Sequence, residues 1–183
     1  MPETPRIVIT GAPGTGKSTL LNIIEKQGFI VHPEMARQVI KEESLKCSDC
    51  VPWQDHSSFG MVLFGRQREQ YLAALEGKIN FYDRVIPDNL GYLRRDTLQN
   101  KKLEAEALKY PYHHQIFLTP PWKEIYMQDA ERWEDFELML EIHDALVDIY
   151  TFFGYDIIEV PKSDPQTRVD FIWNNLNLRE VHP

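Results

Sequence analysis

The sequence has 183 residues, of which 43% are hydrophobic and 26% are charged, a composition typical of one globular domain. Its formal net charge of −8 argues against a general affinity for nucleic acid or anionic membranes, so an anionic ligand needs a local positive site. No apolar run approaches membrane-spanning length, and two cysteines are too few to staple a secreted domain of this size, so we expect a cytoplasmic protein.

Short apolar segments alternate along the chain with longer segments of helical periodicity. The predicted strands are Arg6–Thr10, Phe29–Val31, Ile79–Tyr82, Gln115–Leu118 and Ile157–Val160. The predicted helices are Ser18–Lys26, Pro33–Glu43, Phe59–Leu75, Pro87–Arg95, Lys101–Lys109, Glu134–Phe153 and Pro165–Leu176. This alternation predicts one α/β domain over residues 1–183, with three α/β/α layers around a five-stranded parallel sheet.

A glycine-rich loop directly follows the first predicted strand. Gly11, Gly16, Lys17 and Ser18 complete the pattern G-x-x-x-x-G-K-[ST], in which glycines let successive backbone N–H groups approach phosphate oxygens. Lys17 is expected to reach the β- and γ-phosphates, and the Ser18 hydroxyl is a candidate ligand for Mg²⁺. The predicted nucleotide-binding residues are Gly11, Ala12, Pro13, Gly14, Thr15, Gly16, Lys17, Ser18 and Thr19.

Other classes of triphosphate-binding protein fit the sequence less well. A GTPase needs Asn-Lys-x-Asp, but the segment that begins Asn100-Lys101 lacks the aspartate. Asp88 and Gly91 imitate the switch motif Asp-x-x-Gly but fall after the third strand has ended. Motor ATPases usually close a strand with Asp-Glu, whereas this strand is followed by Asp83-Arg84, which suits small-molecule kinases better.

Charged residues follow the second and third predicted strands. Asp83 is a candidate Mg²⁺ ligand, directly or through water, and Arg84 a candidate contact of the transferring phosphoryl group or of its acceptor, because ligands gather at the carboxyl ends of parallel strands. Glu34 is a candidate base for an acceptor hydroxyl, and Arg37, one turn later, a candidate acceptor-binding residue. The simpler interpretations are a strand-end ion pair and a helix-start carboxylate.

Polar residues interrupt the apolar face of the helix that begins near Phe59. Arg66 and Gln67 therefore either bind the acceptor or take part in an internal hydrogen-bond network. An irregular segment over about residues 44–58 is expected on the acceptor side. Its Cys47 and Cys50 form a lone C-x-x-C without a second pair, which predicts loop thiols rather than a zinc site.

The segment after the fourth predicted strand resembles a closing lid over about residues 119–133. It contains tandem prolines and two tryptophans. Arg132 is the predicted catalytic residue of this lid and Lys123 a weaker candidate, because either cation can approach the phosphates as charge develops there. The alternative is that both are solvated partners of neighbouring acids.

Four segments carry a family resemblance: GAPGTGKST, HPEMARQVI, FYDRVIPDNLGYL and PPWKEIYMQDAERWEDFE. Together they resemble the NadR-like P-loop family of small ATPases and kinases, often described as AAA-domain proteins, which includes the ribosylnicotinamide kinase domain. The resemblance spans nearly the whole chain and implies a P-loop fold that uses ATP and Mg²⁺. More distantly, Glu34 and Asp83-Arg84 resemble the acid and the acid-Arg pair of deoxynucleoside kinases, although this chain has one lid arginine rather than a cluster.

The sequence thus predicts ATP- and Mg²⁺-dependent phosphoryl transfer to a small hydroxyl-bearing metabolite, nucleoside- or nucleotide-like, by a monomer or homodimer. The alternative is a regulatory P-loop ATPase that acts through a protein partner. A kinase differs from such a regulator in needing a second polar pocket beside the γ-phosphate.

Overall fold

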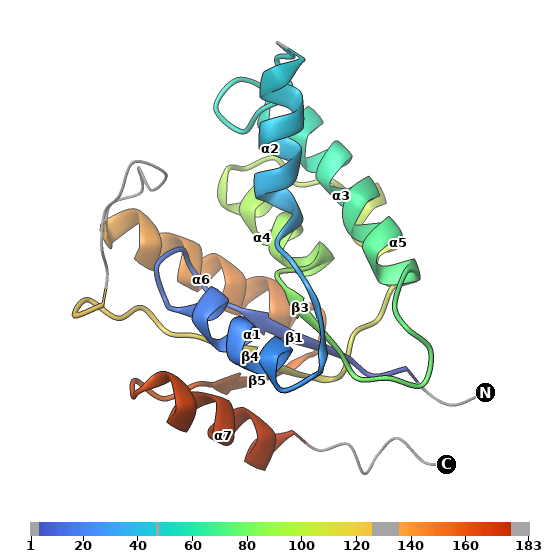
Figure 1. Cartoon of the computed structure of the whole chain (residues 1–183). Helices are drawn as coiled ribbons and strands as arrows, with labels where there is room; N and C mark the ends of the chain where they lie inside the picture. The colour runs from blue at the N-terminus through green and yellow to red at the C-terminus, as the bar shows by residue number, and fades with distance from the viewer. Residues whose placement is uncertain (1–3, 47, 126–135, 177–183) are drawn as a thin grey trace.

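A computed structural model describes residues 4–46, 48–125 and 136–176. Five strands form one parallel sheet in the order β2-β3-β1-β4-β5 (Figure 1). They are β1 (Arg6–Thr10), β2 (Ile30–His32), β3 (Asn80–Asp83), β4 (Gln115–Leu118) and β5 (Asp156–Glu159). The predicted α/β class with a five-stranded parallel sheet is confirmed.

Helices cover both faces of the sheet and complete the three layers. One face carries α1 (Lys17–Lys26) and α7 (Pro165–Asn175). The other carries α3 (His56–Leu72), α4 (Ile86–Arg95), α5 (Lys101–Ala107) and α6 (Phe136–Phe152). Side chains alternate between the two faces along the central strand β1. Ile7 and Ile9 therefore pack in the core under α1 and α7, whereas Val8 packs in the core on the opposite face. Both faces of β1 are thereby buried, which explains its unbroken β-branched sequence.

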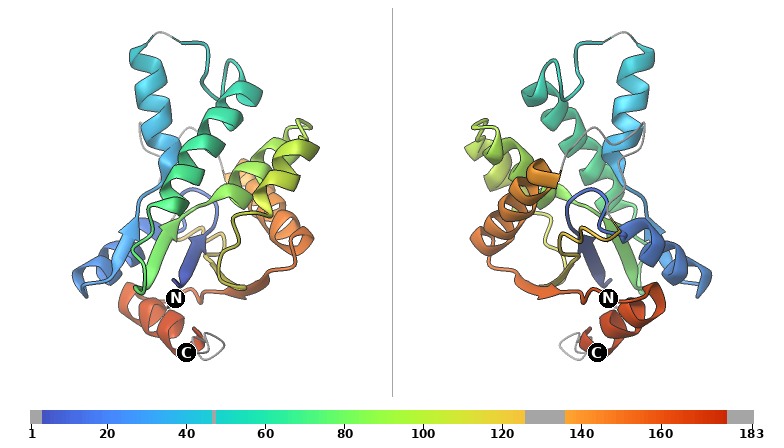
Figure 2. Two further views of the ribbon diagram at one scale, coloured as in Figure 1. Left: turned by 90° about the vertical axis from the view of Figure 1, so that its right-hand side faces the viewer. Right: turned by 90° about the vertical axis from the view of Figure 1, so that its left-hand side faces the viewer.

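Helix α2 (Met35–Leu45) does not cover the sheet. It lies beside the start of α3, through contacts of Val39 with Phe59 and Leu63, and this part of the molecule extends away from the strands (Figure 2). The expected irregular segment, residues 44–58, is shorter than predicted because α2 continues to Leu45 and α3 already begins at His56. Asp55 explains the early start of α3, since its carboxylate accepts the backbone N–H of Ser58 at 2.9 Å.

Within the described ranges, no helix is both long enough and apolar enough to cross a membrane.

Candidate functional site

The glycine-rich loop joins the carboxyl end of β1 to the first turn of α1. Gly11 has φ +143° and Gly16 has φ +85°, conformations that side chains rarely adopt. A Cβ on Gly11 would collide with Thr119, and one on Gly16 would lie 2.8 Å from Nη1 of Arg168. The two glycines are therefore required by backbone shape and by close packing. The loop approaches the start of α1, as a phosphate-binding loop does.

Lys17 folds back over this loop. Its Nζ donates to the carbonyl oxygens of Gly11 at 2.7 Å and Ala12 at 2.8 Å, and the residue is only 6% exposed. Burial, reinforced by the positive charge of Arg84, lowers the pKa of Lys17 to about 7. An anion placed in the loop would stabilise the charged ammonium and draw it away from the carbonyls, so Lys17 is suited to bind phosphate.

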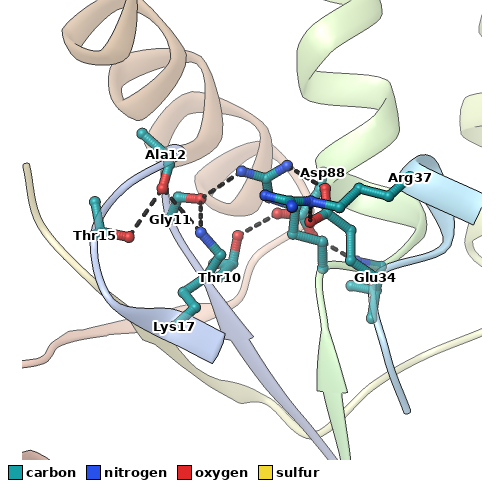
Figure 3. A network of polar contacts seen from close by, with 10 residues as sticks. Thr10, Gly11, Ala12, Thr15, Lys17, Glu34, Arg37 and Asp88 are labelled. Atoms are coloured by element: carbon teal, nitrogen blue, oxygen red, sulfur yellow. Dashed lines mark hydrogen bonds and ion pairs between the residues drawn. The ribbon is translucent and has the colours of Figure 1, made fainter. Parts of the chain in front are cut away.

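Glu34 and Arg84 meet beside the loop from two different strand ends. Arg84 Nη1 donates to Glu34 Oε1 at 2.6 Å, and Arg84 Nη2 donates to the carbonyl of Gly11 at 3.3 Å. Figure 3 shows Glu34 and Arg37 across the network from Lys17. Arg37 Nε lies 3.4 Å from Glu34 Oε2, but its side chain is 58% exposed. The structure thus brings the predicted acid and arginine together at the phosphate loop.

Electrostatics keep both members of this pair ionised. Burial acts to raise the pKa of Glu34, but the positive charges of Arg84 and Lys17 hold it below its usual range. Burial likewise acts to lower the pKa of Arg84, but the Glu34 carboxylate holds it above its ordinary value. Arg84 also has a left-handed backbone, with φ +57°. Such a conformation is uncommon in residues other than glycine and shows that the backbone is constrained at this position.

Asp83 and Ser18 are the candidate magnesium ligands. Asp83 is 6% exposed, and its Oδ1 has no hydrogen-bond partner among the described residues. Burial raises the pKa of Asp83, and the positive charge of Lys17 offsets only part of this effect. Ser18 is exposed in the first turn of α1. Mg²⁺ is usually held by one or two protein oxygens together with substrate phosphates, so an orphaned carboxylate oxygen and a hydroxyl fit its chemistry.

The remaining predicted site residues have different surroundings. Gln67 is 3% exposed and its Oε1 has no partner among the described residues, whereas Arg66 pairs with Glu42 at 2.6 Å. The ion pair of Arg66 is partly exposed, and Gln67 has a free amide oxygen, so acceptor binding by either residue stays a prediction. The described part of the predicted lid ends at Ile125, so Arg132 lies outside the described residues.

The sequence analysis missed two buried residues that hold the loop. Arg168, on α7, donates both terminal nitrogens to the carbonyl of Thr15 at 3.1 Å each, and its guanidinium lies 5.8 Å from the ring centre of Trp122. No local motif marks it, because α7 reads as an ordinary amphipathic helix. The sequence shows Asp88 only as part of a switch-like motif, but its carboxylate accepts hydrogen bonds from Thr10 of β1, Tyr150 of α6 and Val85 in the turn before α4.

Comparison with known proteins identifies a family for this chain. The profile of a family described as an AAA domain matches residues 6–168. The chain belongs to this AAA-domain family. The expected resemblance is thereby confirmed, and no curated protein matches the sequence significantly.

Solved structures that share the fold of this AAA-domain protein include two kinases and the NadR protein. Deoxyadenosine kinase from M. mycoides is 14% identical, with a TM-score of 0.64 over 94% of this chain and 98% of that chain. Thymidylate kinase from Ehrlichia chaffeensis is 14% identical, with a TM-score of 0.63 over 93% of this chain and 98% of that chain. NadR protein in complex with NR is 19% identical, with a TM-score of 0.68 over 93% of this chain and 51% of that chain. The fold is therefore that of P-loop kinases.

Proposed function

We propose that this protein uses ATP and Mg²⁺ to phosphorylate a hydroxyl group of a small metabolite, nucleoside- or nucleotide-like. The observation that carries the proposal is the contact of Glu34 with Arg84 beside Gly11, because it joins an acid and a phosphoryl-binding cation at the phosphate loop. The kinase folds of the solved relatives support the same choice.

In the proposed reaction, Arg84 exchanges the Glu34 carboxylate for phosphate oxygens of the bound triphosphate. A bound triphosphate competes for Arg84, since phosphate oxygens and the Glu34 carboxylate both accept its planar N–H fork. As Arg84 turns towards the phosphoryl group, Glu34 loses a positive neighbour and its pKa rises, which strengthens it as a base. Glu34 then orients the acceptor hydroxyl and accepts its proton, while Lys17 and Arg84 stabilise charge on the phosphoryl oxygens. Mg²⁺ held by Ser18 and Asp83 would neutralise further charge on the phosphates.

The acceptor is expected to bind on the side of Glu34 that faces α2 and α3. Gln70 donates to the carbonyl of Pro33 at 2.8 Å, so this face of α3 lies next to the start of the Glu34 turn. Gln67, one turn before Gln70, offers a buried amide oxygen without a partner, which is suited to a ring N–H or hydroxyl of the acceptor. Arg37 is close enough to Glu34 to contribute a second polar contact.

A metabolite panel tests the proposal. Purified protein is incubated with ATP and Mg²⁺ together with individual nucleosides, nucleotides and other hydroxyl-bearing metabolites, and formation of ADP and of phosphorylated product is measured. We expect one chemical class to yield product, and chelation of Mg²⁺ to abolish the reaction. ATP hydrolysis at the same rate with every metabolite, without any phosphorylated product, would favour the regulatory ATPase instead.

A further inference from the structure

Asp88 is a buried carboxylate at the centre of three structural elements. It is 1% exposed and lies in the first turn of α4. Its Oδ2 accepts the backbone N–H of Val85 at 2.7 Å and the Tyr150 hydroxyl at 2.5 Å, and its Oδ1 accepts the Thr10 hydroxyl. Burial raises the pKa of Asp88, although these hydrogen bonds act in the opposite direction. Such a group persists in a core only when its partners are fixed.

Two of these partners adjoin residues of the candidate site. Thr10 is the last residue of β1 and precedes Gly11, whose carbonyl contacts both Lys17 and Arg84. Val85 follows Arg84 and caps α4, so the bond from its N–H to Asp88 fixes the peptide group that joins Arg84, with φ +57°, to the start of this helix. One carboxylate thus contacts the residue before the phosphate loop and the residue after the arginine. Figure 3 shows Asp88 in this position, linked to Thr10.

The network also continues from Thr10 into the loop itself. The Thr10 carbonyl accepts the backbone N–H of Thr119 at 2.8 Å. The Thr119 hydroxyl lies 2.6 Å from that of Thr15, and the Thr15 hydroxyl lies 2.9 Å from the carbonyl of Ala12. Thr10, Thr15 and Thr119 are all fully buried. A displacement of Thr10 is therefore transmitted to both ends of the loop through buried hydrogen bonds.

We propose that Asp88 is a positioning residue that sets the phosphate loop and Arg84 at a fixed separation, acting through Thr10 on one side and Val85 on the other. The inference rests on the proposed function, because it concerns the alignment of donor phosphate and arginine. The third partner, Tyr150 on α6, anchors the carboxylate to the core but leads to no site residue among those described. Thr10 and Tyr150 thus both stabilise Asp88, but only Thr10 connects it to the phosphate loop. This difference makes it possible to test positioning of the loop separately from stability of the fold.

Two matched variants test this difference between Thr10 and Tyr150. Thr10→Val and Tyr150→Phe each remove one hydroxyl donor to Asp88 with little change in shape, but only the first cuts the link to the loop. The affinity for the Mg²⁺ complex of a non-hydrolysable ATP analogue is measured by calorimetry, and hydrogen exchange is followed in residues 11–17. We expect Thr10→Val to weaken binding about tenfold and to accelerate exchange in the loop. Tyr150→Phe should change neither, although both variants lower the melting temperature.

Two further variants test the link itself. Thr10→Ser restores the hydroxyl and should restore both affinity and exchange protection. Asp88→Asn keeps an acceptor for Val85 and Tyr150 and can donate to the Thr10 oxygen, so it should preserve loop protection where Asp88→Ala loses it. Equal effects of Thr10→Val and Tyr150→Phe, or no recovery in Thr10→Ser, would overturn the proposal. If the wild-type protein does not bind the analogue, the proposed function fails, and hydrogen exchange alone decides the role of Asp88.

Discussion

The two halves of the candidate site differ in where their polar groups come from. The phosphate loop consists of consecutive residues, 11–17, whose carbonyl groups hold the ammonium of Lys17. The acceptor side consists of charged side chains from separate strand ends, and Glu34 is held by Arg84. In each half, the charge of the main functional residue, Lys17 or Glu34, is held by protein groups that a substrate has to replace. The loop depends mainly on local chain geometry, whereas the acceptor side depends on the pairing of β2 with β3.

The largest effect is expected on the acceptor side. Glu34→Gln retains size and hydrogen-bonding capacity but removes the base, so turnover should fall by about 10²–10⁴-fold. Affinity for MgATP should not fall, because the phosphate loop is intact and Arg84 loses the carboxylate with which a triphosphate competes. Steady-state kinetics with the identified acceptor and calorimetry with ATP provide the measurements. Glu43→Gln, on the same helix, is the matched control; full turnover in Glu34→Gln would return Glu34 to the role of a helix-start residue.

A smaller loss is expected on the loop side. Lys17→Ala removes the phosphate-binding ammonium, so turnover should fall by about 10²–10³-fold, accompanied by weaker MgATP binding. The fold should survive, because a partly desolvated cation is removed rather than a packed apolar side chain. Circular dichroism checks the fold, and Lys26→Ala at the exposed end of α1 is the control. Unchanged affinity for ATP would contradict the phosphate-loop assignment and remove the contrast between the two halves.

The pH dependence of ATP affinity tests Lys17, the charged residue of the phosphate loop, separately from the acceptor side. The pKa of Lys17 is about 7 in the ligand-free protein, and a bound phosphate should raise it, so binding takes up a proton above pH 7. Affinity should therefore fall as pH rises from 7.5 to 9, by up to about tenfold per pH unit. Calorimetry in buffers of different ionisation enthalpy measures the uptake. Lys17→Met should abolish the proton uptake, and a wild-type protein without any uptake would refute this account of Lys17.

The smallest effect is expected for Arg168, whose guanidinium holds the phosphate loop through the Thr15 carbonyl. Arg168→Lys replaces a two-pronged contact with the Thr15 carbonyl by a single ammonium, so the free energy of unfolding should fall by about 1 kcal/mol. Urea denaturation measures the change. Asp170→Asn, on the exposed side of the same helix, should stay within about 0.5 kcal/mol of the wild type. An unchanged stability of Arg168→Lys would show that the loop does not need this contact.

The same contrast explains how much the sequence could predict. The strands and helices followed from periodicity, with errors of a few residues at α2 and α3, where the Asp55 cap was overlooked. The loop was predictable because its chemistry lies in consecutive residues, and Glu34 and Arg84 because parallel strands end at one edge. Asp88 and Arg168 were not, since a buried acid and a buried arginine look like surface charges until their distant partners are known.

Strand order also has a consequence for the nascent chain. β1 precedes the other described strands in the sequence, and the strands that it pairs with are β3 and β4, which begin at Asn80 and Gln115. During synthesis one edge of the central strand therefore stays unpaired until β3 has been made, and the other edge until β4 has been made. Exposed strand edges attract non-native partners, and pairing of distant segments is slow. The segment that carries the phosphate loop is thus the one that a chaperone has most reason to shield on the ribosome.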